Sequence, residues 1–120
     1  MYRLENQSGD PSAIQLWKGN PRSAVYPVNS SVIFTPEAIY SVDSGTSALT
    51  AVSIENGERL WETVEPVLAD PDQRGRHGTA FLVRYKNTDT YYILNENGEL
   101  IIAEVTPKGY REQGRTQVIE

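Results

Sequence analysis

The sequence predicts an all-β fold, for three reasons. No window repeats apolar residues at i, i+3, i+4 and i+7 over more than two turns, so long helices are not expected. Nine glycines and seven prolines are spread along the 120 residues and would interrupt such helices. Short β-branched and aromatic runs recur instead between clusters of turn-forming residues, which is typical of antiparallel sheets.

The start of the chain predicts a hairpin followed by a loop. Residues 1–5 and 13–17 contain apolar side chains and are separated by the polar turn NQSGDP. Residues 18–29 include Pro21 and Pro27 and are expected to form a loop.

Two groups of four strands follow, and turn residues mark their ends. The first group is predicted at 31–34, 38–42, 48–54 and 58–63. Asn56-Gly57 in its last turn is the strongest hairpin signal, because both residues tolerate φ > 0. Beyond the polar connection 65–77, the second group is predicted at 79–85, 90–94, 100–105 and from Tyr110 onward. The chain is therefore expected to hold eight to ten strands.

The second group repeats the first. With an offset of 52 residues, Ala51 falls on Ala103 and Gly57 falls on Gly109. The further matches are Ile39-Tyr40 with Tyr91-Tyr92, Leu49 with Ile101, SVIF with AFLV after a three-residue shift, and Trp61 with Gln113. Four short strands repeated about every 40 to 50 residues are typical of propeller blades. A chance likeness between two hairpins of a β-sandwich is the alternative.

A single four-stranded sheet cannot bury both faces alone, so such units must stack. We therefore predict one propeller-like domain over residues 1–120, with a partial blade at 1–20 and blades at 27–64 and 78–119. The small Ala51 and Ala103 suit close contact between sheets, and Trp17 and Trp61 could cover a neighbour. About two and a half blades are fewer than the roughly four to eight of closed propellers. Copies would have to assemble, or further blades would have to complete the ring.

The segment LTAVSIENGERLW resembles the repeat of quinoprotein-type (PQQ-like) β-propellers, A-x-D-x-x-T-G-x-x-x-W. Ala51, Gly57 and Trp61 match this pattern, whereas Ser53 and Asn56 stand where the family has aspartate and threonine. The resemblance covers residues 13–119, and their last part looks like the final blades of bacterial PQQ-like repeat proteins. It implies a propeller fold and suggests a periplasmic or extracytoplasmic location.

Quinoprotein dehydrogenases of this family hold PQQ between a tryptophan and a disulfide, beside a Ca²⁺ bound by acidic and amide groups. This chain has no cysteine, and no matching acidic constellation is visible in it. The repeat instead assigns Trp17 and Trp61 to docking positions. We therefore interpret the resemblance as architectural and expect no cofactor.

Composition and charge argue against two classes of protein, those that bind nucleic acid and those that span a membrane. A net charge of −5 argues against nucleic acid as the main partner. No apolar run approaches the length of a membrane span. The opening MYRLENQSGD lacks the pattern of a secretory signal, so no export signal is expected in this chain and its location stays open.

Several side chains could carry chemistry, and for each a structural role is favoured. His77 is the one imidazole, but no nucleophile lies at a catalytic spacing from it. Ca²⁺ could bind at Asp43-Ser44-Gly45 or at Asp70 and Asp72, although these residues are also ordinary turn formers.

The same applies to three further groups: the basic stretch Arg74, Arg76, Arg84 and Lys86, the tyrosines Tyr85, Tyr91 and Tyr92, and the carboxylates Glu58, Glu62 and Glu65. The basic stretch could bind an anion but is expected to be a solvated loop and the outward face of a strand. The tyrosines could stack on a base or sugar but suit packing within or between sheets. The carboxylates could hydrolyse a glycoside, but no facing acid is predicted.

The expected function is a non-catalytic scaffold or protein-interaction module. Its first expected partner is a second copy of the chain or the remaining blades of a longer one. The alternative is a PQQ-dependent oxidoreductase, as a fragment or remnant, and a carbohydrate or peptide binder is a third possibility. No catalytic, cofactor or metal residue is assigned. The residues assigned to structural docking are Trp17, Ala51, Gly57, Trp61, Ala103 and Gly109.

Overall fold

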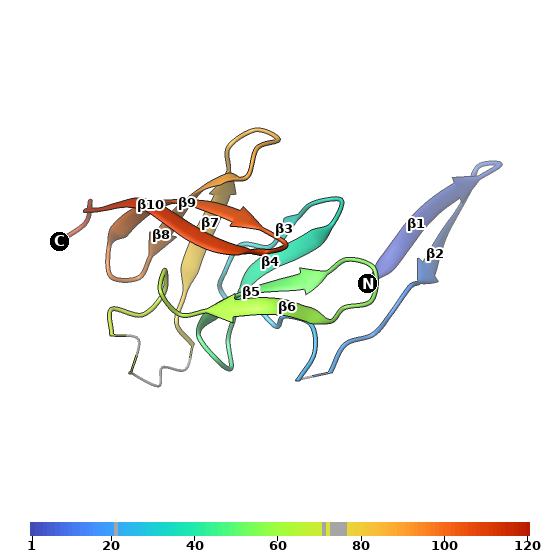
Figure 1. The fold of residues 1–120 in the computed structure, drawn as a ribbon. Helices are drawn as coiled ribbons and strands as arrows, with labels where there is room; N and C mark the ends of the chain where they lie inside the picture. Colours follow the sequence, from blue (N-terminus) through green and yellow to red (C-terminus); the bar gives the residue numbers. More distant parts are fainter. Residues whose placement is uncertain (21, 71, 73–76) are drawn as a thin grey trace.

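The computed structural model describes residues 1–20, 22–70, 72 and 77–120, and it confirms the all-β prediction: these residues form ten strands and no helix. The strands form three antiparallel sheets (Figure 1). The first is a hairpin of β1 (Tyr2–Gln7) and β2 (Asp10–Gln15). The second contains β3 (Ile33–Phe34), β4 (Ala38–Asp43), β5 (Ala48–Ser53) and β6 (Arg59–Thr63). The third contains β7 (Ala80–Arg84), β8 (Thr90–Asn95), β9 (Glu99–Thr106) and β10 (Gly109–Gln117).

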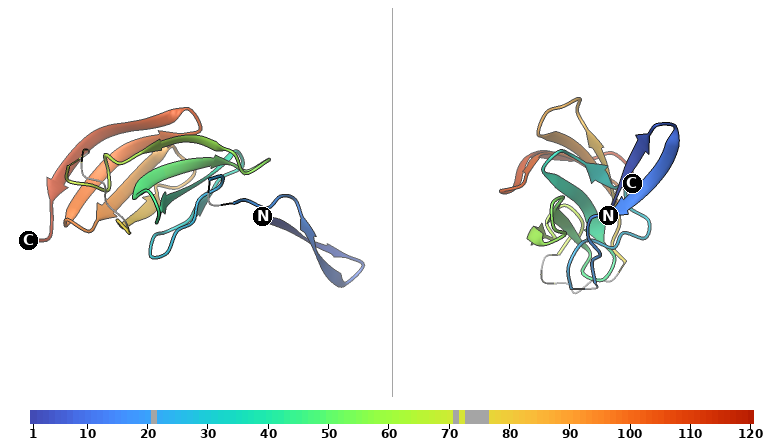
Figure 2. Two further views of the ribbon diagram at one scale, coloured as in Figure 1. Left: turned by 90° about the horizontal axis from the view of Figure 1, so that it is seen from below. Right: turned by 90° about the vertical axis from the view of Figure 1, so that its right-hand side faces the viewer.

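The two four-stranded sheets lie beside each other, and the β1–β2 hairpin extends away from them (Figures 1 and 2). Each four-stranded sheet is a meander in which neighbours in sequence are neighbours in space. Every residue of the hairpin strands is exposed except the half-buried Glu5. The protein is accordingly elongated, with extents of 53 × 30 × 25 Å.

The turns that follow β4 and β8 are built in the same way. The buried Asp43 accepts hydrogen bonds through Oδ1 from the backbone N–H groups of Gly45 and Thr46, at 3.0 and 3.2 Å. The buried Asn95 accepts them through Oδ1 from Asn97 and Glu99, at 3.1 and 3.0 Å. Short polar side chains that satisfy the turn backbone explain why both strands end at these residues.

The main hydrophobic core lies between one face of each four-stranded sheet, with the connection between the sheets closing it. Its fully buried residues include Tyr40, Val42, Leu49 and Ala51 from the first sheet, Val67 from the connection, and Leu82, Tyr91, Ile93, Ile101 and Ala103 from the second. Alternate residues of each strand face this core, as the period of two in a pleated strand requires.

Backbone hydrogen bonds show which residues of the two sheets correspond. The carbonyl oxygen of Ala38 accepts a hydrogen bond from the backbone N–H of Thr35, next to β3. The carbonyl oxygen of Thr90 accepts one from the backbone N–H of Tyr85, next to β7, and both distances are 2.9 Å. Along a strand, the backbone N–H and C=O groups point alternately to the two neighbouring strands, and the side chains point alternately to the two faces. Residues whose backbone groups point to the equivalent neighbour therefore have side chains on the equivalent face. Two residues further on, Tyr40 therefore corresponds to Tyr92. Ile39 then corresponds to Tyr91, as the repeat predicted.

The register corrects the expected repeat in the third strand. Val52 pairs with Ile39 and Ala103 pairs with Tyr91, so Ala103 corresponds to Val52 and not to Ala51. The true counterpart of Ala51 is Ile102. The physical reason is a length change, because the turn enclosed by the pair Leu94–Leu100 is one residue shorter than the turn enclosed by Val42–Leu49. Leu49 accordingly corresponds to Leu100, not to Ile101.

The first and fourth strands need similar corrections. Ile33 pairs with Tyr40 and Val83 with Tyr92, so SVIF is displaced by one residue from the expected match with AFLV. In the fourth strand, Trp61 pairs with Ala51, and Gly114 pairs with Ile102. Gly114, and not Gln113, therefore occupies the position of Trp61. Gln113 is the extra residue of a β-bulge between Glu112 and Gly114.

The outer faces of the two sheets differ. On the first sheet, Ile39 and Val52 are buried under the segment that follows the hairpin, in a cluster with Trp17, Ala24 and Val25. On the second sheet, no comparable layer of described residues covers the outer face. This outer face carries exposed apolar side chains: Phe81 at 52%, Val83 at 62%, Tyr92 at 37% and Ile102 at 37%. We call these four residues the open face.

Candidate functional site

Trp17 joins the end of the hairpin to the first four-stranded sheet. Its indole Nε1 donates a hydrogen bond to the carbonyl oxygen of Ile54, at 2.9 Å. The ring lies against Gly57, where an added Cβ would come within 2.5 Å of a ring carbon. Gly57 also has φ of +77°, a conformation that glycine adopts at little cost. Glycine is therefore required here both for the turn and for the contact.

Trp61 joins the first four-stranded sheet to the second in a similar way. Its Nε1 donates to the carbonyl oxygen of Thr106, at 2.8 Å, and its ring packs against Tyr40 with centroids 6.2 Å apart. In both cases an indole that lies in the last strand of one unit, or just beyond it, reaches the end of the third strand of the next unit. Gly109 takes no part in the contact, because a Cβ there would meet no atom within 4 Å.

Ala51 and Ala103 both lie in the main core and have no exposed surface. They lie on non-equivalent faces of their own sheets. Ala103 corresponds to Val52, and Val52 points to the opposite face from its neighbour Ala51. The two sheets therefore meet through different faces: the side of the first sheet that holds Ala51 packs on the side of the second that holds Ala103.

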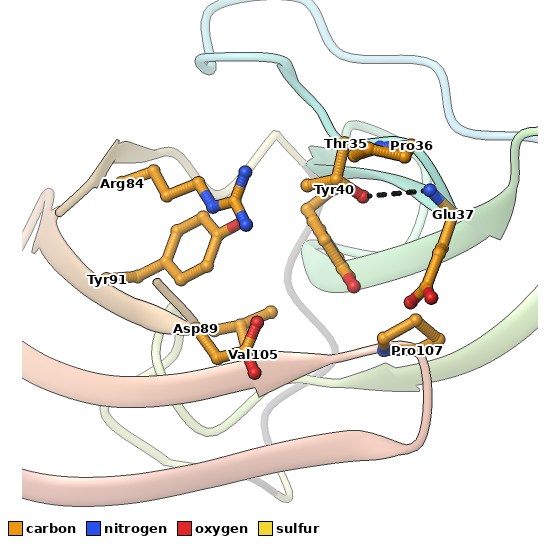
Figure 3. A pocket seen from close by; sticks show the side chains of 9 residues that line it. All are labelled: Thr35, Pro36, Glu37, Tyr40, Arg84, Asp89, Tyr91, Val105 and Pro107. Atoms are coloured by element: carbon orange, nitrogen blue, oxygen red, sulfur yellow. Dashed lines mark hydrogen bonds between the residues drawn. The ribbon is translucent and has the colours of Figure 1, made fainter. Parts of the chain in front are cut away.

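A polar pocket of about 330 Å³ opens where three turns of the two sheets meet (Figure 3). Arg84 and Tyr91, which pair across β7 and β8, lie on one side of it, and Glu37 and Tyr40 lie on the other. Asp89, Val105 and Pro107 are among the remaining lining residues. Val105 and both tyrosines are buried, whereas Glu37 and Asp89 are exposed at the rim.

Burial and charge perturb the two tyrosines of this pocket. Burial raises the pKa of Tyr40 well above its usual value, and the nearby Tyr91 and the carboxylates of Asp89 and Glu37 raise it further. Burial also raises the pKa of Tyr91, while the positive charge of Arg84 acts in the opposite direction. Both hydroxyls are therefore protonated at neutral pH and can donate hydrogen bonds.

The pocket was not predicted from the sequence. Arg84 was expected on the outward face of its strand, but it follows Ala80 and Leu82 on the inward face. The alternation of buried residues in this strand was a signal that could have placed it correctly. The contributions of Glu37 and Asp89 carried no such signal, because each lies in a turn of a different sheet.

His77 and the three carboxylates considered for chemistry lie apart or in structural contacts. His77 is exposed, has φ of +65°, and donates its backbone N–H to the carbonyl oxygen of Ser44, at 3.0 Å. Glu62 pairs with Arg59 at 3.2 Å, and Glu58 and Glu65 are exposed. No geometry for acid–base catalysis links these groups within the described part of the chain.

Two of the three aspartates that could have bound Ca²⁺ accept hydrogen bonds from protein groups. Besides its turn, the Asp43 carboxylate accepts hydrogen bonds from the backbone N–H of Tyr26 and from Arg59, each at 3.0 Å. Asp70 accepts from the backbone of Asp72, and both residues are exposed. The described residues contain no group of three or more histidine or acidic side chains that could hold a metal ion.

The basic stretch and the tyrosines separate in the structure. Arg74 and Arg76 lie outside the described residues, and Lys86 lies over the ring of Tyr85, 5.3 Å from its centroid. Tyr85 and Tyr92 form an exposed edge-to-face pair, with centroids 6.3 Å apart, whereas Tyr91 is in the core. They do not form one stacking platform.

Within residues 1–20, 22–70, 72 and 77–120, no helix is long and apolar enough to cross a membrane. Comparison of the chain with protein-family models, with curated proteins and with solved structures gives no match.

Proposed function

We propose that the protein is a non-catalytic scaffold or interaction module of the β-propeller type, and that its open face binds a further unit of the same kind. The observation that carries this proposal is the contact between non-equivalent faces of the two sheets. In a sandwich with a two-fold relation, equivalent faces would meet. Here Tyr40 of the first sheet meets Tyr91 of the second, 5.8 Å between ring centroids, although Tyr40 corresponds to Tyr92.

Contact between non-equivalent faces can be continued by adding units. The outer face of the first sheet, which holds Ile39 and Val52, is covered. The equivalent face of the second sheet points into the main core. The open face of the second sheet corresponds in turn to the core-facing side of the first. A head-to-tail arrangement of this kind closes into a ring or continues as a stack. An exposed apolar face of this kind marks an interaction site.

The first occupant to test is a second copy of the chain. The β1–β2 hairpin supplies an unpaired apolar side for such a contact, because Tyr2, Leu4 and Ala13 share one of its faces and are all exposed. It lies at the opposite end of the molecule from the second four-stranded sheet, which carries the open face (Figure 1). The blades of a longer chain would cover the same face in the same way.

Sedimentation velocity of wild type and two variants tests self-association. Ile102→Lys places a charge in the open face and is expected to give a monomer, because a buried unpaired charge is costly. Val118→Lys is the matched control, since Val118 is similarly exposed at 51% but lies beyond β10. It should associate like wild type. A wild type that remains monomeric from micromolar to near-millimolar concentration would contradict self-association.

The residues do not fit the quinone site that the family resemblance suggests. Both tryptophans are engaged in docking contacts, and the buried Asp43 carboxylate is saturated by protein donors. Titration with PQQ and Ca²⁺ tests the rival oxidoreductase. A saturable change in quinone absorption would overturn the non-catalytic proposal.

A further inference from the structure

Tyr91 carries an unexplained hydroxyl group. Its side chain is 1% exposed, yet its hydroxyl has no hydrogen-bond partner in the described structure. Buried polar groups nearly always have a partner, and phenylalanine would fill the same space without the cost of an unpaired hydroxyl. Since Tyr91 lines the polar pocket, the missing partner is expected to be a molecule that enters this pocket.

Three charged side chains around the same pocket form no ion pair with the described residues. Arg84 uses Nε to bond the carbonyl oxygen of Thr88, at 2.8 Å, and its terminal nitrogens bond no described residue. The Glu37 and Asp89 carboxylates form no ion pair among the described residues. The pocket thus offers donors at Arg84 and Tyr91 and acceptors at its rim. Two negative charges oppose one positive charge.

We propose that this pocket binds a free cationic α-amino acid, of which lysine is the simplest probe. The carboxylate of the ligand pairs with the Arg84 guanidinium and accepts the hydrogen bond of the Tyr91 hydroxyl. Its ammonium groups face Glu37 and Asp89. The volume of about 330 Å³ is at the lower end of small-molecule pockets and suits a ligand of this size.

Calorimetric titration with L-lysine tests the proposal, and Trp61 fluorescence provides a second signal because Tyr40 joins its ring to the pocket. Saturable binding is expected. Cadaverine, which is lysine without its carboxylate, should bind at least about tenfold more weakly because it cannot engage Arg84 and Tyr91. L-glutamate, which adds a negative charge, should bind weakly as well. The titration is repeated on the Ile102→Lys variant, so that self-association does not contribute.

Two pairs of variants locate the binding. Tyr91→Phe should weaken lysine binding about tenfold or more while leaving the unliganded protein at least as stable. Tyr92→Phe, the adjacent change on the opposite side of β8, should leave lysine binding unchanged. Arg84→Gln should weaken binding, whereas Arg111→Gln, on the exposed β10, should not. The absence of saturable lysine binding, equal affinity for cadaverine, or full affinity in Tyr91→Phe would each overturn the proposal.

Discussion

At the scale of single residues, the contact between Trp17 and Gly57 depends on the lack of a side chain. Both the positive φ and the closeness of the indole ring exclude a Cβ at residue 57. We therefore expect Gly57→Ala to lower the free energy of unfolding by about 1–3 kcal/mol. Urea denaturation followed by tryptophan fluorescence measures this loss.

Gly109→Ala is the matched control for this prediction. Gly109 begins the last strand of the second sheet, directly after its turn, and an added Cβ there meets no atom within 4 Å. Its substitution should change the free energy of unfolding by less than about 1 kcal/mol. Equal losses in the two variants would show that the ring of Trp17 does not require Gly57.

At the scale of the strands, β4 and β8 bring the buried Tyr40 and Tyr91 together, and burial raises the pKa of both. A raised folded-state pKa means that the folded protein holds the proton more tightly than the unfolded chain. This contribution to stability is complete below the usual tyrosine pKa of about 10 and is lost as pH rises above it. Stability should therefore fall on the alkaline side.

Tyr91→Phe should make this alkaline decline less steep, because one buried ionisable group is removed. The measurement is the free energy of unfolding in urea at a series of pH values from about 8 to about 11. Tyr92→Phe removes an exposed hydroxyl from the same strand and should leave the wild-type slope. If Tyr91→Phe also leaves it unchanged, the decline has another origin.

The strands of the two four-stranded sheets could be predicted closely because their ends are marked by turn residues that act locally. Asp43 ends β4 and Asn56-Gly57 precedes β6, each by chemistry confined to a few neighbours. The prediction for the hairpin was less accurate: its turn is formed by Ser8 and Gly9 alone, so β2 begins at Asp10 and ends before Trp17. The register between repeats could not be predicted by one offset. A turn shortened by a single residue exchanges the two faces of β9, so Ala103 matches Val52.

The candidate site was less predictable than the fold. Trp17 and Trp61 were identified by a sequence pattern, but their acceptors are backbone carbonyl groups, which any residue supplies. The pocket combines Glu37, Arg84 and Asp89 from turns and strand ends of both sheets. These residues come together only when the two sheets pack on each other, so no local sequence pattern marks the pocket.

At the scale of the whole molecule, the structure predicts unequal protection of the backbone. Strand β4 is buried throughout, and β8 is paired on both edges and buried on its core-facing side, whereas both faces of the β1–β2 hairpin are in contact with solvent. In the Ile102→Lys monomer, hairpin amides should exchange hydrogen with far lower protection than those of β4 and β8. Hydrogen exchange measured residue by residue checks this expectation.

Association should change the exchange of the same hairpin. If the open face of one copy receives the hairpin end of another, wild type at high concentration should protect amides in β1 and β2. The Ile102→Lys variant at the same concentration provides the comparison. Association without added protection in the hairpin would place the contact elsewhere on the molecule.

The outermost strand of the second sheet, β10, determines how such an assembly can grow. It carries Arg111 and Arg115, which form ion pairs with Glu104 and Glu99 of β9 at 3.0 and 2.9 Å, and it is interrupted by a bulge. Charged side chains and bulges oppose the addition of another strand along a sheet edge. Concentrated solutions should therefore form no cross-β fibrils, and the fluorescence of an amyloid-binding dye should not increase in them.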